Sequence, residues 1–97
     1  MSHDNKPTPG PWVTDRTTVE RKLAVRAADS QFAICTFEAF VKNHEANARL
    51  CAAAPDLLEA LKWIEYHYAN QDMSHGDFRV EAYSRALAAI QRAGSEQ

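Results

Sequence analysis

Basic side chains gather in one part of the chain, where they could bind an anion. They are Arg16, Arg21, Lys22 and Arg26. Only two acidic residues accompany these four between positions 11 and 28, so the segment carries a net charge of +2. Guanidinium and ammonium groups pair with phosphates and carboxylates, so a phosphate ligand or an acidic partner could bind there. A solvated strand edge stays open as the alternative, because Lys and Arg on strands also discourage edge-to-edge aggregation.

Aromatic side chains form a second group with possible binding chemistry. Trp63 and Tyr66 are three residues apart in one helical pattern, and Tyr83 belongs to the next. Aromatic residues are enriched at protein interfaces, where they contribute much of the binding energy. They also serve as ordinary core, and the sequence leaves both interpretations open.

Potential nucleophiles and metal ligands are scattered along the chain. They are His3, His44, His67, His75, Cys35 and Cys51. None of them forms a CxxC, HxxxH or HExxH spacing. Two helical turns separate His44 from Cys51, about 10 Å along a helix, which is too far for direct proton transfer. The run Ser74–Asp77 is better explained as a cap and turn than as a catalytic triad. We therefore expect no catalytic residue, no metal and no cofactor, and we expect both thiols to be reduced and packed in the core.

Composition limits the possible partners. The net charge of the 97 residues is −2, which argues against strong nonspecific binding to nucleic acid. Residues 29–81 carry nine acids against four bases, and this uneven division would allow head-to-tail self-association. No apolar stretch approaches a membrane span, and residues 1–10 lack the apolar run of a signal peptide, so we expect the cytoplasm of a cell. So short a chain buries only about 60–65% of its unfolded surface, which favours a homo-oligomer or a partner.

An antiparallel β-meander is predicted for the first part of the chain. Apolar and polar residues alternate between residues 12 and 37 and favour three strands, at 12–18, 22–28 and 31–37. One face of the sheet is expected to carry Leu23, Val25, Phe32 and Ile34 and to need a cover.

Helices are predicted to provide that cover. Pro55 fits the first position of a helix, so we predict one helix over 43–54 and a second over 55–69, with a single kinked helix as the alternative. Ser74 and Asp77 are both possible caps for a third helix over 77–93. The predicted core stripes have helical spacing. They comprise Leu57, Leu58, Leu61, Ile64 and Tyr68 in the second helix and Val80, Tyr83, Leu87 and Ile90 in the third.

The prediction is therefore a single α+β domain over residues 1–97. A flexible lead-in, residues 1–10, precedes the small antiparallel meander of about three strands at 11–40. The helical part at 43–94 contains two or three helices packed on one face of the sheet.

Two motifs resemble a group of small phage and prophage accessory proteins. They are TPGPW at residues 8–12 and NARLCAAAPDLLEALK at residues 47–62. Cys51 departs from the pattern, which has an aliphatic residue there, and this favours a core thiol. Outside the two motifs the resemblance extends only to the layout of the chain. It implies a phage or prophage gene expressed in a bacterial host.

The leading functional hypothesis is a non-enzymatic phage protein that binds and inhibits a host protein complex, as an anti-defence inhibitor of the anti-CRISPR type. The expected contact surface combines the four basic strand residues with Trp63, Tyr66 and Tyr83. One alternative is an oligomeric sponge that holds a nucleotide immune signal between subunits, with the arginines on the phosphates. Another is a small structural or regulatory phage protein. Direct binding of nucleic acid or a membrane is not expected.

Overall fold

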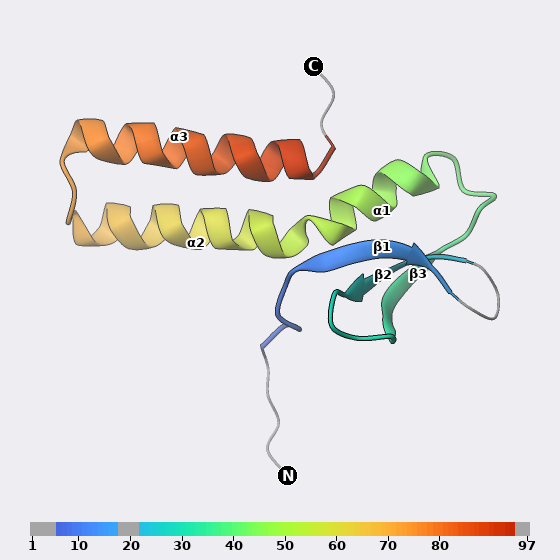
Figure 1. The fold of residues 1–97 in the computed structure, drawn as a ribbon. Coiled ribbons are helices and arrows are strands. Elements are labelled where there is room, and N and C mark those ends of the chain that lie inside the picture. Colours follow the sequence, from blue (N-terminus) through green and yellow to red (C-terminus); the bar gives the residue numbers. More distant parts are fainter. Residues whose placement is uncertain (1–5, 18–21, 95–97) are drawn as a thin grey trace, which may run out of the picture.

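A three-stranded antiparallel sheet forms the first half of the fold (Figure 1). The computed structural model describes residues 6–17 and 22–94. The strands are β1 (Trp12–Arg16), β2 (Leu23–Ala27) and β3 (Ala33–Phe37), and they lie side by side in chain order. The predicted meander and the α+β class are confirmed. Each strand is shorter than predicted, and residue 18 of the first predicted strand lies outside the described residues.

The strand register corrects the predicted face of β3. Leu23 pairs with Phe37 and Val25 with Cys35, so Cys35 and Phe37 share the covered face. Phe32 and Ile34, which were predicted there, are instead 74% and 40% exposed. A shift of one residue moves a side chain to the opposite face, and both alternating sets in this segment are apolar. The sequence pattern alone therefore could not choose between them.

Three helices follow the sheet: α1 (His44–Ala52), α2 (Ala54–Asn70) and α3 (His75–Arg92). Only Ala53, in right-handed helical conformation, separates α1 from α2, and Pro55 lies in the first turn of α2 as predicted. The structure therefore has two helices, as in the first prediction, but they follow each other almost without a break, as in the alternative of a single kinked helix. Ser74 is the N-cap of α3, and its hydroxyl accepts a hydrogen bond from the Asp77 backbone N–H at 3.1 Å. This confirms the predicted cap role.

The core lies between the sheet and α1, which contacts all three strands. Val25, Ala48 and Ala52 form its buried centre. Five partly buried side chains pack around them: Trp12, Leu23, Cys35, Phe37 and Cys51. Every other buried residue of the described chain is an alanine, so Val25 is the largest fully buried side chain there. The core is therefore thin for a chain of this length.

Helices α2 and α3 form an antiparallel hairpin that projects beside the sheet instead of covering it (Figure 1). No residue of α2 is buried, and Ala89 is the only buried residue of α3. The prediction that these apolar stripes are buried in the core is wrong, because Leu61 is 65% exposed and Tyr83 is 69% exposed. The hairpin packs through small residues and Trp63, and the large aliphatic side chains face outward. Helical periodicity identified the apolar faces and could not tell which face meets the other helix.

Candidate functional site

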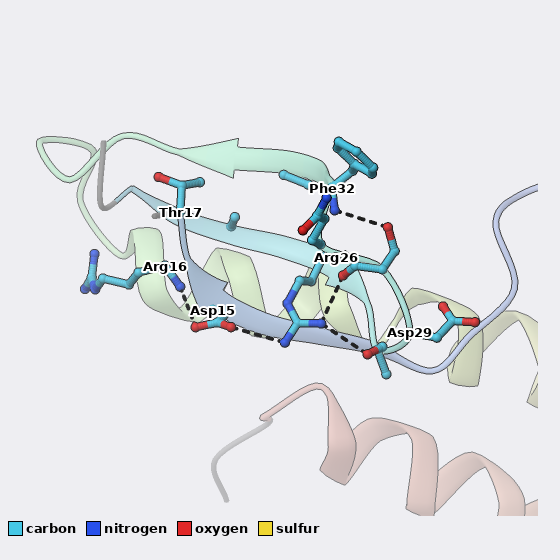
Figure 2. A pocket seen from close by; sticks show the side chains of 11 residues that line it. Asp15, Arg16, Thr17, Arg26, Asp29 and Phe32 are labelled. Carbon is cyan, nitrogen blue, oxygen red and sulfur yellow. Dashed lines mark hydrogen bonds and ion pairs between the residues drawn. The ribbon is translucent and has the colours of Figure 1, made fainter. Parts of the chain in front are cut away.

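Arg26 lies across the face of the sheet that α1 leaves uncovered, and its charge is compensated there (Figure 2). Its Nη2 donates to a carboxylate oxygen of Asp15 at 3.1 Å. Its Nη1 donates to the backbone carbonyls of Ala27, Ala28 and Ser30 at 3.1–3.2 Å. The guanidinium therefore fastens β2 to β1 and to the following turn. A phosphate would have to compete with all four acceptors.

The Asp15 carboxylate is held in its charged form. The backbone N–H of Arg16 donates to it at 2.8 Å, and together with the Arg26 guanidinium this lowers the pKa of Asp15 below its ordinary value. Both groups bond to the anion, so protonation would weaken both contacts. Because the carboxylate is solvent-exposed, its contribution to stability is small.

A hollow of about 740 Å³ lies beside this ion pair, between β1 and the turn that leads to β3. Arg26, Ser30 and Phe32 are among the residues that line it (Figure 2). Its size suits a small ligand. Two cations, Arg16 and Arg26, line it, and Arg26 is already paired with Asp15. Lys22 makes an ion pair with Glu38 at 2.8 Å, near the other end of β2. Arg21 lies outside the described residues.

The three aromatic residues that were predicted to share a contact surface lie in different environments. Trp63 is half-buried between the helices, where its ring stacks on Phe78 with a centroid separation of 5.8 Å. The Arg85 guanidinium lies over the Trp63 ring, 4.6 Å from its centroid. Tyr66 is 56% exposed and follows Trp63 by three positions, on the flank of α2 away from Leu61 and Ile64. Tyr83 points to the opposite flank. Among the described residues, Trp63 contacts Phe78 and Arg85 of the hairpin, whereas Arg26 and Lys22 are bonded within or beside the sheet.

One flank of the hairpin is apolar, and we call it the hairpin face. It consists of Leu57, Leu61, Ile64 and Tyr68 from α2 and Tyr83, Leu87 and Ile90 from α3. Residues spaced by three and four positions share one face of a helix. Five of the seven side chains are at least 38% exposed. A large exposed apolar area of this kind marks an interaction surface.

A second apolar area borders β3, and we call it the edge surface. It consists of Phe32, Ile34, Phe40 and Val41. Phe32 is 74% exposed at the start of the strand, and Phe40 is 85% exposed just after its end. β3 pairs only with β2 among the described strands, so its outer edge presents open backbone hydrogen-bonding groups. The sequence reasoning missed this surface because it assigned Phe32 and Ile34 to the core.

The cysteines lie against the core and are free thiols. Cys35 of β3 and Cys51 of α1 approach each other where the helix covers the sheet. Burial, followed by the neighbouring Cys51, raises the pKa of Cys35. A raised pKa leaves little thiolate at neutral pH, which is the opposite of what a nucleophilic cysteine needs. Within residues 6–17 and 22–94, no three His, Cys, Asp or Glu side chains are close enough to hold a metal ion.

The two recognisable motifs of the sequence meet at the joint between the sheet and the helices. A Cβ atom on Gly10 would lie 2.7 Å from the Pro55 Cβ, so the TPGPW segment and the start of α2 are in close contact. Arg92 of α3 donates to the Trp12 backbone carbonyl at 3.1 Å and pairs with Asp56 at 3.3 Å. The motifs therefore hold this joint together, and Leu57 and Leu61 of the second motif also contribute to the hairpin face.

Comparison with known proteins gives one match. The family model described as Salmonella phage P22 protein Y8K6 matches residues 1–97, the whole sequence. No curated protein and no solved structure matches. In the described part of the chain, no helix is both long enough and apolar enough to cross a membrane.

Proposed function

Because the chain belongs to the family of Salmonella phage P22 protein Y8K6, we propose that it is a non-enzymatic phage accessory protein that binds a host protein complex and inhibits it. The observation that carries this proposal is the edge surface, where open backbone groups of β3 lie between exposed Phe32 and Phe40. The inhibited complex is proposed to be a defence system in the cytoplasm of the host, and this part of the proposal rests on the phage family alone.

The edge surface suits an extended segment of another protein. Such a segment would pair with the outer edge of β3 and extend the sheet, so that backbone hydrogen bonds supply affinity. Phe32 and Phe40 lie at opposite ends of the five-residue strand, where they would contact side chains of that segment. Natural proteins usually protect an exposed apolar strand edge, so an unprotected edge is favourable for binding.

A nucleotide sponge is the second candidate, and the hollow beside Arg26 is the observation in its favour. The four hydrogen bonds that already occupy Arg26 make it the weaker candidate. Mass spectrometry of the denatured, freshly purified protein separates the two. A released nucleotide would favour the sponge, and its absence together with no binding of cyclic nucleotides would count against it.

Capture from host lysate tests the leading proposal. The tagged wild-type chain should retain a host complex, and the variant F32S/F40S should retain at least tenfold less of it. Val80→Ser, a change of a 72% exposed residue on α3, is the matched control and should retain as much as the wild type. If the wild type retains no host protein, or if both variants retain it equally, the edge surface is not the binding site.

A further inference from the structure

The hairpin face is an apolar surface that the chain itself leaves uncovered. Leu61, Tyr68 and Tyr83 are 65%, 70% and 69% exposed. Leu87 and Ile90 continue the same face along α3. Isolated exposed apolar residues are normal, but five large exposed ones on a single flank of two paired helices need a cover.

On the opposite flank of the hairpin, charged side chains form ion pairs and a cation–π contact with one another and with Trp63. Asp56 pairs with Arg92 across the two helices, and Arg85 reaches over the Trp63 ring while pairing with Glu81 at 2.9 Å. Because the helices are antiparallel, the apolar positions of both helices lie on the side away from these contacts. The hairpin is therefore amphipathic as a unit, with one charged flank and one apolar flank.

The dimensions of the chain indicate that a large surface remains to be buried. Its accessible surface is 7598 Å², whereas a compact monomer of 10.9 kDa exposes about 5,600 Å². Its radius of gyration is 16.4 Å, against about 12.5 Å for a compact domain of 97 residues. A standard interface buries about 800 Å² on each partner, so the excess is large enough to supply one.

We propose that a second copy of this chain covers the hairpin face and forms a two-fold symmetric dimer. Five of the thirteen exposed large apolar side chains of the described residues lie on the hairpin face, against four on the edge surface. Pairing of two such faces produces a four-helix arrangement with the charged flanks outside.

Light scattering coupled to size-exclusion chromatography tests the dimer with purified protein alone. The wild type should have a mass of about 22 kDa, twice that of one chain. Leu61→Glu and Tyr83→Asp each place a charge in the proposed interface and should give a mass of one chain. Tyr66→Asp is the matched control, because Tyr66 is also an exposed tyrosine of the hairpin and lies off the hairpin face. It should remain dimeric.

Circular dichroism melting covers the case in which the interface variants do not fold. The melting temperature of the wild type should rise with protein concentration, and unfolding of only the two interface variants would also support the dimer. A wild-type mass of one chain with a concentration-independent melting temperature overturns the proposal. A dimer insensitive to both substitutions, or equally sensitive to Tyr66→Asp, also overturns it. The variant F32S/F40S should stay dimeric, so failure of host capture is distinguishable from failure of the dimer.

Discussion

Val25→Ala should destabilise the protein more than most single substitutions, because Val25 has no exposed surface and forms the centre of the core with Ala48 and Ala52. The change removes two buried carbons, which costs about 1.6 kcal/mol at ~0.8 kcal/mol each. The two buried residues of the neighbouring helix, Ala48 and Ala52, have short side chains that cannot move into the space, so a cavity term adds about 1 kcal/mol. The expected loss in the free energy of unfolding is about 2–3 kcal/mol.

Urea denaturation at one fixed protein concentration measures this loss. With an m-value of about 1–1.5 kcal/mol/M, the midpoint should fall by roughly 2 M. Val41→Ala is the matched control, since Val41 is 45% exposed and lies outside the hairpin face. It should change the free energy by less than about 0.5 kcal/mol, as is usual for substitutions at the surface. A loss below about 1 kcal/mol for Val25→Ala, or equal losses for the two variants, would refute the assignment of the core.

Three further predictions concern the cap and the two perturbed ionisable groups. Ser74→Ala removes the N-cap of α3 and should lower the free energy of unfolding by about 1 kcal/mol; no change in urea would argue against the cap. The lowered pKa of Asp15 means that its contribution to stability is present above about pH 4 and is lost as the pH falls through that pKa. The difference between wild type and Asp15→Asn should therefore shrink between pH 6 and pH 3. The raised pKa of Cys35 predicts that, in a Cys51→Ser variant, iodoacetamide at pH 8 modifies this thiol more slowly than free cysteine; an equal rate would contradict it.

Local signals in the sequence predicted the local features of the fold correctly. Pro55 marked the start of α2, because a proline without an N–H is tolerated in the first turn. Ser74 marked the start of α3, because a serine hydroxyl can accept a hydrogen bond from a backbone N–H in the first turn of a helix. The alternation of residues in the first part of the chain predicted a three-stranded meander, and the structure has one.

Features that depend on packing between distant segments were not predictable in this way. Leu61 and Tyr83 have the spacing of a core stripe, yet the hairpin packs through the side that contains Ala89 and Trp63. Periodicity detects an apolar face and does not say what covers it. The same limit applies to Phe32, whose face depends on the strand register.

The candidate binding surfaces include Leu61, Tyr83 and Phe32, whose packing the sequence pattern did not predict. The predicted contact surface required the basic strand residues and the hairpin aromatics to lie together, but Arg26 is engaged within the sheet and Trp63 between the helices. The hairpin face is instead made of residues that the sequence pattern assigned to the core, and Phe32 and Ile34 of the edge surface were assigned there as well. An unpaired apolar residue and a core residue look alike in sequence, and only the fold distinguishes them.

Plaque formation on a defended bacterial host tests the proposed function most directly. Cells that carry an active defence system and express the wild-type chain should allow a phage sensitive to that system to form plaques at least tenfold more efficiently than cells with an empty vector. The variant F32S/F40S, expressed at the same level, should lose this gain, and Val80→Ser should keep it. Equal plaque numbers with the wild type, the variant and the empty vector, across hosts with different defence systems, would contradict the proposal.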